Sequence, residues 1–540
     1  MAERIIRLVV IALLWIPAYI LAVRFNLHMF QLNGYKNNEQ LTWIRKNFRK
    51  QWILIWDFWL GVARCFFGWL WLDIVIALSL IMTILVYRAH KRLNTKKKLV
   101  MTARVKRLTV TIVILSDAIV MPLSLFVNGW LSTGLLLVAL GTQFWLNIVA
   151  NLVNRPMEKS VGNWYINDAK KKLQSVRDIK IIGITGSYGK TSVKFYLQTL
   201  LQSKYNTLVT PESFNTPMGV VRTIREHLKP THEIFVCEMG ARYVGDIKEL
   251  CDIVHPQMGV ITSIGPQHLE TFGDMDHVRD TKFELADALP EGGTIFLNGD
   301  NEYIQQKAGQ YKNVVFYFAD GNDAAGAGGA AKTDAGNPAG SGYRAQMTSV
   351  SQLGTSFTMT TPDGETEEFQ MRLVGAHNII NVAGAITVAH QLGISLKELK
   401  IPVRKIQPVP HRMQLREHGE VTIIDDAYNS NPVGSKAAVE TLKLFDGVRI
   451  LITPGMVELG DKEDEYNYKL GTYAAECCDY ILLVGAKHTE PIRKGVLDKG
   501  FPEKKCRTYE HLEEALNYAY GIHDDGHKYI LLENDLPDNY

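Results

Sequence analysis

A glycine-rich stretch whose residue types could hold phosphate occupies residues 183–191, which read GITGSYGKT. A strand-like segment precedes it and the helix-like segment SVKFYLQTLLQ follows it, which is the context that a phosphate-binding loop requires. The glycines let backbone N–H groups approach phosphate oxygens, the lysine reaches terminal phosphates, and the threonine can ligate magnesium. The match is not strict, because the usual first glycine falls on Ile184. The stretch predicts a phosphate site, and the alternative is a glycine turn that arose by chance.

Polar side chains also stand where apolar, strand-like segments end. Glu238 ends EIFVCE, His268 follows MGVITSIGPQ, and Asn298 ends TIFLN. Ligands of open parallel sheets gather beyond the carboxyl ends of the strands, so we expect these side chains near the phosphate loop. Taken singly, Glu238 is as readily a surface carboxylate and His268 an ordinary loop histidine.

The elements that must position these residues alternate along the chain. From about residue 160, short apolar strands alternate with amphipathic helices, which is typical of α/β architecture with a largely parallel sheet. The glycine- and alanine-rich segment 319–342 interrupts this pattern and predicts a flexible insertion. A new alternation from VTIIDD at residue 421 predicts a second soluble domain.

The first third of the chain predicts a membrane region. Its apolar stretches are each close to the roughly 20 residues that a helix needs to cross hydrocarbon. The first could be a signal peptide, but further apolar runs follow it, which favours a membrane anchor. We expect about four spans, at residues 5–23, 66–87, 108–127 and 131–153.

Charge and cysteine usage bear on where the soluble part lies. The basic loop 88–107 is expected in the cytoplasm, because cytoplasmic loops carry an excess of lysine and arginine. Basic residues within 24–51 would then lie outside, a conflict that a fifth span or an interfacial helix there would remove. The six cysteines show no disulfide or zinc spacing, which favours a reducing, cytosolic setting.

The formal net charge of +3 is nearly balanced. A chain of 540 residues is too long for a single hydrophobic core, so several domains are expected.

The ordered set of motifs resembles the Mur ligase family between about residues 180 and 490. The set is TGSYGKTS, CEMGARYVGDI, ITSIGPQHLETFGDMDHVRDTKFEL, LNGDN, GAHNIINVAGAI, HRMQ, IIDDAYNSNP and PGMVELGD. It is most similar to the branch that adds D-alanyl-D-alanine to the peptidoglycan precursor. The apolar runs predict N-terminal transmembrane helices (1–155). The resemblance implies a central ATP-binding α/β domain with a parallel sheet (156–404) and a C-terminal Rossmann-like domain (405–540).

The family joins a carboxylate to an amine at the expense of ATP. The carboxylate attacks the γ-phosphate to give an acyl phosphate, the amine attacks that, and a tetrahedral intermediate expels phosphate. Because anions approach each other, cationic screening dominates the barrier. The resemblance implies two magnesium sites, with Thr191 and Glu238 at the first and His268 at the second. Lys282 falls where the family carries a carbamylated lysine that serves the second magnesium, and a solvated helix lysine is the alternative.

The remaining implied residues belong to the nucleotide. Arg412 and Asp426 would come from the C-terminal domain to the phosphates and ribose, so that domain must close over ATP. Asn381 could instead be a helix cap, and Asp425 is expected to be structural. The implied catalytic residues are Lys190, Glu238, His268 and Lys282. The implied nucleotide-binding residues are Gly186, Ser187, Tyr188, Gly189, Lys190, Thr191, Ser192, Asn298, His377, Asn378, Asn381, Arg412 and Asp426.

The sequence also departs from the family. The chain ends ILLENDLPDNY where the D-alanyl-D-alanine branch has a lysine-glycine-serine run. The diaminopimelate motif and the zinc-ribbon cysteines of sister branches are missing, and membrane segments stand where a UDP-gripping domain is expected. We therefore expect a multi-pass protein of the cell membrane with its ligase domains in the cytoplasm.

Its expected substrates are a cell-envelope precursor, lipid-linked or UDP-linked, and an amino acid or dipeptide such as D-alanyl-D-alanine. No nucleic-acid partner is expected, and the oligomeric state is left open. The alternative is a non-ligating membrane protein that uses ATP as a conformational switch. The presence of His268 and Lys282, which a second metal would need, argues against that alternative.

Overall fold

The computed structural model describes residues 2–67, 69, 71–92, 98–124, 129–320, 342–375, 377–427, 431–457, 459–524 and 526–534. The chain forms two compact units, Met1–Trp164 and Tyr165–Leu536. The expected boundary at 155/156 lies inside a helix, α7 (Gln143–Gln174), which begins in the first unit and ends in the second. Ala169 and Leu173 of this helix belong to the core of the second unit.

The first unit is helical in all its described parts. Its helices are α1 (Ala2–Leu32), α2 (Asn37–Lys46), η1 (Phe48–Gln51), α3 (Trp52–Phe66), α4 (Leu72–Arg92), α5 (Ala103–Ser124), α6 (Gly129–Gly141) and the first part of α7. Helices α3 and α6 pack closely because small residues meet there: a Cβ on Gly61 would lie 2.7 Å from the carbonyl oxygen of Gly134. A buried carboxylate, Asp57, accepts hydrogen bonds from Ser79 (2.5 Å) and Thr83 (2.7 Å).

Fewer helices than expected qualify as membrane spans by length and composition. Among the described residues, Val9–Leu32 and Leu72–Ala89 qualify, and Leu131–Gly141 with Gln143–Gln174 would be a third if this pair, bent by 71°, counts as one span. The expected span at 108–127 lies in α5 as far as residue 124, and its last three residues lie outside the described part of the chain. The described helix does not qualify. Within 24–51, the ten-residue α2 is too short to cross hydrocarbon.

Helix α3 presents a tryptophan face to its surroundings. Trp52, Trp56 and Trp59 are each more than half exposed, and their spacing places them on one side of the helix. Tryptophan is enriched where membranes meet water. This face therefore suits a membrane interface better than bulk water.

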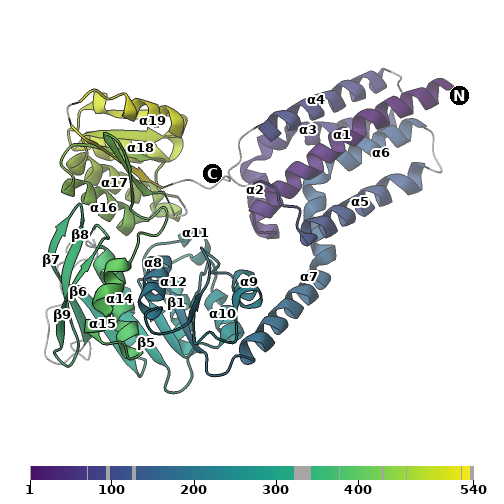
Figure 1. Ribbon diagram of the computed structural model, residues 1–540. Helices are drawn as coiled ribbons and strands as arrows, with labels where there is room; N and C mark the ends of the chain where they lie inside the picture. Colours follow the sequence, from purple (N-terminus) through teal and green to yellow (C-terminus); the bar gives the residue numbers. More distant parts are fainter. Residues whose placement is uncertain are drawn as a thin grey trace. The chain divides into compact units, whose positions relative to one another are not determined.

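The second unit contains two sheets (Figure 1). In the described residues, the larger sheet has nine strands in the order β2-β3-β1-β4-β5-β6-β7-β8-β9. Strands β2 to β7 pair in parallel, and β8 and β9 continue antiparallel. The bounds are β1 (Lys180–Thr185), β2 (Thr207–Val209), β3 (Ile234–Glu238), β4 (Met258–Ile261), β5 (Thr294–Asn298), β6 (Val314–Asp320), β7 (Gly342–Ser351), β8 (Gly354–Thr360) and β9 (Thr366–Met371).

Helices cover both faces of this sheet, which explains why every residue of β1 after Lys180 is buried. Ile182 and Ile184 pack into one core, and Ile181 packs into the other. Helices α8 and α14 lie side by side over the first core (Figure 1). The helix bounds are α8 (Lys190–Leu201), α9 (Pro217–His227), α10 (Asp246–Val254), α11 (Leu269–Phe272), α12 (Met275–Asp287), α13 (Glu302–Ala308), α14 (His377–Gln391) and α15 (Leu396–Lys405).

The smaller sheet has six described strands in the order β10-β11-β15-β12-β13-β14, parallel except for β10. Its strands are β10 (Gln414–His418), β11 (Val421–Asp426), β12 (Val448–Thr453), β13 (Tyr480–Val484), β14 (Cys506–Tyr509) and β15 (Lys528–Glu533). Its helices are α16 (Pro432–Thr441), α17 (Glu463–Cys477), α18 (Ala486–Asp498) and α19 (Leu512–Tyr520), with the short turns η3 (Leu442–Leu444), η4 (Gly460–Lys462) and η5 (Glu503–Lys505). Both sheets agree with the α/β class expected from the sequence.

The expected insertion at 319–342 needs a correction at its ends. Ala319 and Asp320 are part of β6, and Gly342 begins β7. These residues pair in the sheet although their neighbours are glycine-rich: Ala319 and Asp320 pair with Ala345 and Gln346, and Gly342 pairs with Phe316. Residues 321–341 lie outside the described part of the chain.

Candidate nucleotide-binding and catalytic site

The phosphate loop joins the carboxyl end of β1 to the start of α8. Gly186 and Gly189 have φ values of 149° and 80°, the region that favours glycine. A Cβ would lie 2.2 Å from Thr262 Oγ1 at Gly186, and 2.5 Å from Asn381 Oδ1 at Gly189. Both glycines are therefore required by backbone conformation and by close neighbours.

Ser187 and Tyr188 hold this loop to the segment after β4. The Ser187 N–H donates to the carbonyl of Ser263 at 2.6 Å, and its hydroxyl donates to the carbonyl of Gly265 at 3.0 Å. The Tyr188 hydroxyl donates to the carbonyl of Pro266 at 2.7 Å. These two side chains, expected at the nucleotide, thus fix the loop conformation.

Lys190 lies folded back over the loop. Its Nζ donates to the carbonyl oxygens of Gly186 (2.6 Å) and Ser187 (3.0 Å). Burial lowers the pKa of Lys190 to about 8, against the opposing effect of Glu238, and the Arg412 guanidinium lowers it further. Arg412 of the C-terminal part is therefore close enough to the loop to repel its lysine.

Glu238 ends β3 and is 1% exposed. Its Oε1 accepts hydrogen bonds from Thr191 Oγ1 and Asn215 Nδ2, both at 3.0 Å, and its Oε2 lies 3.0 Å from Lys194 Nζ. Burial opposes ionisation of Glu238, but Lys194 and Lys190 outweigh it and hold its pKa below the ordinary value. The carboxylate is thus charged, beside the threonine that was expected to share a magnesium ion with it.

Lys282 lies on α12 and is 2% exposed. Burial, followed by repulsion from Lys190, lowers the pKa of Lys282 to about 7. Its Nζ stands 5.6 Å from the centre of the Phe272 ring. Two lysines from different helices therefore come within electrostatic reach of each other, as expected if an anion binds between them.

His268 follows β4, as expected, and begins α11 in the left-handed conformation, with φ 53°. Its carbonyl accepts hydrogen bonds from the N–H groups of Thr271 and Phe272. No group of three His, Cys, Asp or Glu side chains in the described residues is arranged to hold a metal ion. The protein groups fit a magnesium that brings most of its ligands with it, as magnesium bound to nucleotide phosphates does.

The remaining residues expected to bind the nucleotide have different surroundings. Asn381 of α14 lies against Gly189 of the loop, and Asn298 donates to the carbonyl of Thr262 at 2.9 Å. Asn378 is turned inward: its Oδ1 accepts from Tyr196 at 3.1 Å, and its Nδ2 donates to the Val374 carbonyl at 2.9 Å. Three further expected residues are Ser192, which is buried on α8, Thr191, described above, and His377, whose side chain lies outside the described part.

The carboxyl edge of the smaller sheet gathers acidic groups. Asp426 ends β11 and accepts a hydrogen bond from the Met413 N–H at 3.1 Å. Burial and the nearby Glu533 raise the pKa of Asp426 to about 7. Its neighbour Asp425 pairs with His411 and Arg416, both at 2.8 Å, which agrees with a structural role for Asp425.

Sequence reasoning missed Lys194, Asn215 and Glu533. Glu533 ends β15 and accepts hydrogen bonds from Ser435 (2.5 Å) and Thr453 (2.7 Å). The signal that singled out Glu238, an acid at the end of an apolar strand, is also present in YILLE. Lys194 follows Thr191 on the same helix, one turn on, but no sequence pattern pairs it with Glu238.

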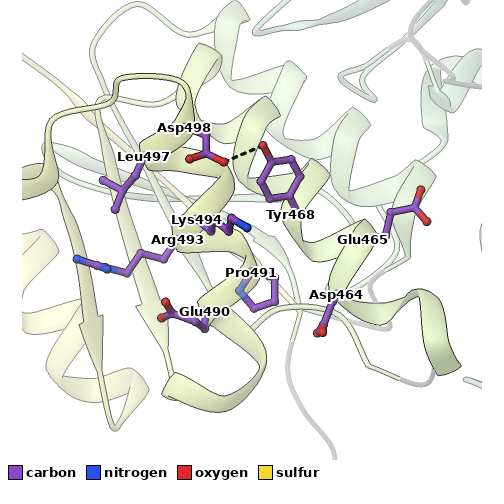
Figure 2. Close-up of a pocket in the computed structure, with 9 residues that line it drawn as sticks. All are labelled: Asp464, Glu465, Tyr468, Glu490, Pro491, Arg493, Lys494, Leu497 and Asp498. Carbon is purple, nitrogen blue, oxygen red and sulfur yellow. Dashed lines mark hydrogen bonds between the residues drawn. The ribbon is translucent and has the colours of Figure 1, made fainter.

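An open groove of about 550 Å³ lies elsewhere, between α17 and α18 (Figure 2). Acidic and basic side chains are mixed along it, and the Tyr468 hydroxyl donates to Asp498 at 2.9 Å. None of the expected site residues lines it. Its lining residues are Asp464, Glu465, Tyr468, Glu490, Pro491, Arg493, Lys494, Leu497 and Asp498.

Solved structures with a similar fold include MurF from Acinetobacter baumannii, with a TM-score of 0.58 and 24% identity, covering 68% of this chain and 76% of that one. MurF ligase from Thermotoga maritima in complex with ADP also has a TM-score of 0.58 and 24% identity, covering 69% and 80%. At this identity the likeness establishes the fold.

Curated relatives carry the name UDP-N-acetylmuramoyl-tripeptide–D-alanyl-D-alanine ligase. The protein of Escherichia coli (strain K12) is 29% identical over 348 residues, which are 62% of this chain and 73% of the relative. The protein of Bacillus subtilis (strain 168) is 29% identical over 306 residues, and this chain spans 62% of its length.

Two family models match the chain within the second unit. The Mur ligase middle domain matches residues 184–389, and the Mur ligase glutamate ligase domain matches residues 411–532. The first range includes the phosphate loop, Glu238 and Lys282, and the second includes Arg412 and Asp426. Together they cover more than half of the 540 residues. The chain belongs to the Mur ligase family.

Proposed function

We propose that this protein is an ATP-dependent ligase that joins a carboxylate of a cell-envelope precursor to the amine of an amino acid or dipeptide such as D-alanyl-D-alanine. The observation that carries the proposal is the phosphate loop, where Lys190 lies over the carbonyl oxygens of Gly186 and Ser187 and Thr191 donates to the buried Glu238. Repulsion between Lys190 and both Arg412 and Lys282 agrees with an anion site there. The names of the curated relatives, which act on a UDP-linked muramoyl tripeptide, support the choice of substrates.

The cations suit the formation of an acyl phosphate. The donor carboxylate attacks the γ-phosphate, and negative charge then crowds around the transferred phosphoryl group. Lys190, now bonded to the loop carbonyls of Gly186 and Ser187, can exchange those partners for phosphate oxygens. Fixed cations aimed at developing charge lower the barrier without reorganisation during the reaction. The amine then attacks the acyl phosphate, and phosphate leaves.

Magnesium fits the oxygen donors at the first site. The Thr191 hydroxyl and the Glu238 carboxylate lie 3.0 Å apart, and hydroxyl and carboxylate oxygens are ligands that magnesium accepts. When bound, the ion neutralises charge on the phosphates. His268 is our proposed ligand for a second magnesium.

Lys282 is proposed to react with carbon dioxide to give a carbamate. The comparisons lend no support to this modification, but a pKa of about 7 leaves much of the amine uncharged, which such a reaction requires. We expect Lys282→Ala to lose most activity and a short-chain carboxylic acid to restore part of it. A fully active Lys282→Ala protein would remove the carbamate from the mechanism.

We further propose that the helical first unit lies in the membrane and that the donor is lipid-linked, which the candidate spans favour. A tether keeps the active site in a thin layer above the bilayer, which raises the effective concentration of a donor held in the same bilayer. We expect protein that starts near Pro156 to bind ATP but to lose far more activity on a lipid-linked donor in membranes than on a soluble analogue. Equal losses on both donors would leave the helical unit as a simple anchor.

The central test is acceptor-dependent release of ADP. Purified full-length protein is supplied with ATP, magnesium, a UDP-linked or lipid-linked precursor, and candidate amino acids or dipeptides. A ligase releases ADP when both donor and acceptor are present. Turnover that ignores the acceptor would instead favour a protein that uses ATP as a conformational switch.

A further inference from the structure

Lys194 is a buried lysine that the proposed chemistry leaves without a role. It lies on α8, one turn after Thr191, and its side chain is 0% exposed. Its Nζ is 3.0 Å from Glu238 Oε2, and it donates a hydrogen bond to the carbonyl of Glu212. An unpaired buried charge is strongly unfavourable, so each of these two charges allows the other to be buried.

The two oxygens of Glu238 are held in different ways. Oε1 accepts hydrogen bonds from two neutral groups, Thr191 Oγ1 and Asn215 Nδ2. Oε2 faces the ammonium of Lys194. Contacts in which both partners are charged are stronger than those with neutral donors. Oε1 can therefore exchange its partners for a metal ion more easily than Oε2 can.

Neighbouring contacts keep the carboxylate from turning. The Glu238 N–H donates to Thr210 Oγ1 at 3.1 Å, and Glu212 and Asn215 belong to the same short segment between β2 and α9. Lys194 thus connects α8, the end of β3 and this segment around one carboxylate. A rotation that exposed Oε2 would break its contact with Lys194 and the hydrogen bonds from Thr191 and Asn215.

A carboxylate with one accessible oxygen discriminates between divalent cations. Magnesium takes six ligands in near-octahedral geometry and is satisfied by one oxygen from a carboxylate, whereas calcium takes six to eight and often binds both. We propose that Lys194 is a positioning residue that keeps Glu238 a one-oxygen ligand and thereby sets a preference for Mg²⁺ over Ca²⁺. The inference rests on the proposed function, because it takes Glu238 as a metal ligand.

The test measures ADP affinity in the presence of either MgCl₂ or CaCl₂. Full-length protein in detergent is titrated by calorimetry, and its thermal unfolding is followed in parallel. Lys194→Met frees Oε2 and keeps an unbranched side chain. We expect the ratio of Mg²⁺-supported to Ca²⁺-supported affinity to fall on the order of tenfold, which corresponds to one hydrogen bond to a charged group.

A second variant and a control keep the test decisive. Lys194→Gln offers Oε2 a neutral hydrogen bond, so it should fold more easily and lower the ratio by a smaller factor. Lys248→Met removes an exposed lysine from its pair with Asp252 at 2.7 Å and should leave the ratio unchanged.

An unchanged ratio in folded Lys194→Met overturns the inference. If that variant does not unfold cooperatively, an unchanged ratio in Lys194→Gln overturns it instead. If the wild-type protein binds no ADP with either cation, the proposed function fails and the inference fails with it. A general structural role for Lys194 would weaken binding with both cations equally and leave the ratio as it was.

Discussion

The carboxyl edges of the two sheets in the second unit differ in the buried groups whose pKa values move toward neutral pH, which are lysines at one edge and a carboxylate at the other. At the larger sheet, burial lowers the pKa of Lys190 to about 8 and that of Lys282 to about 7. At the smaller sheet, burial raises the pKa of Asp426 to about 7, with Glu533 adding to the effect. Desolvation penalises the charged form in each case, so both edges hold groups that titrate near neutral pH.

The two edges differ in the kind of ligand that would favour the charged forms of their buried groups. An anion such as a phosphate favours the ammonium forms at the first edge, and a cationic group favours the carboxylate at the second. Arg412, which comes from the second part of the unit, lowers the pKa values of both Lys190 and Asp426. It therefore couples the two edges electrostatically. Polar groups of opposite sign at adjoining edges suit a reaction that joins an acid to an amine.

Removing the Lys190 ammonium at the edge of the larger sheet should have the largest effect on ligase activity. Lys190→Ala deletes the charge that faces the terminal phosphates but keeps the loop backbone, so we expect acceptor-dependent ADP formation to fall by about a thousandfold. Thermal unfolding should show a folded protein. Near-normal turnover by the folded variant would rule out this loop as the active one.

The pH dependence of nucleotide binding sharpens the comparison. Lys190 is charged below about pH 8 in the free protein, and bound phosphates raise its pKa. ADP affinity should therefore be highest below about pH 8 and fall as the pH rises above it. Lys190→Arg stays charged throughout, so its affinity should change less over the same range. Calorimetric titrations from about pH 7 to pH 10 measure this, and equal slopes for both proteins would contradict the assignment.

The acidic edge should respond to pH in the opposite sense. Because the pKa of Asp426 is raised from 3.8 to about 7, the folded protein binds more protons than the unfolded chain between these values, and its stability falls as pH rises through that window. Asparagine does not titrate, so the Asp426→Asn variant does not lose this stability as the pH rises. At about pH 8 its Tm should exceed the wild-type value by several degrees, because a pKa raised from 3.8 to about 7 corresponds to a loss of roughly 4 kcal/mol.

At about pH 5 the two melting temperatures should lie closer together. Asparagine can still accept the hydrogen bond from the Met413 N–H, so that contact is matched. A constant difference across the range would show that Asp426 does not titrate in it.

The smallest effect is expected away from both edges, at residues 321–341. Strands β6 and β7 run in parallel, with Phe316 paired with Gly342 and Asp320 paired with Gln346. The segment that joins the end of β6 to the start of β7 must therefore span about 13 Å along the strands. Simple joining of residues 318 and 343 would break β6 and β7. Replacing 321–341 by about eight glycine and serine residues should change turnover by no more than about twofold, and a large loss would mean that the segment touches substrate.

The sequence determined the local features of the catalytic unit. The phosphate loop, the strand-end residues Glu238 and Asn298, and the α/β alternation all follow from patterns within short windows, because backbone conformation and side-chain periodicity are local properties. The helical first unit was predicted less well. Hydropathy recognises apolar stretches but does not register the 71° bend between α6 and α7, which depends on packing.

The tertiary structure alone decided which residues meet. It brought Asn381 to Gly189, turned Asn378 toward Tyr196, and set Glu533 beside Asp426 in adjacent strands. It also paired Lys194 with Glu238, which lie 44 positions apart in the chain. Periodicity says which face of an element is buried, whereas the partner on that face depends on strand order and helix packing. For that reason the phosphate loop with Lys190 was evident from the sequence, and the pairing of Lys194 with Glu238 was not.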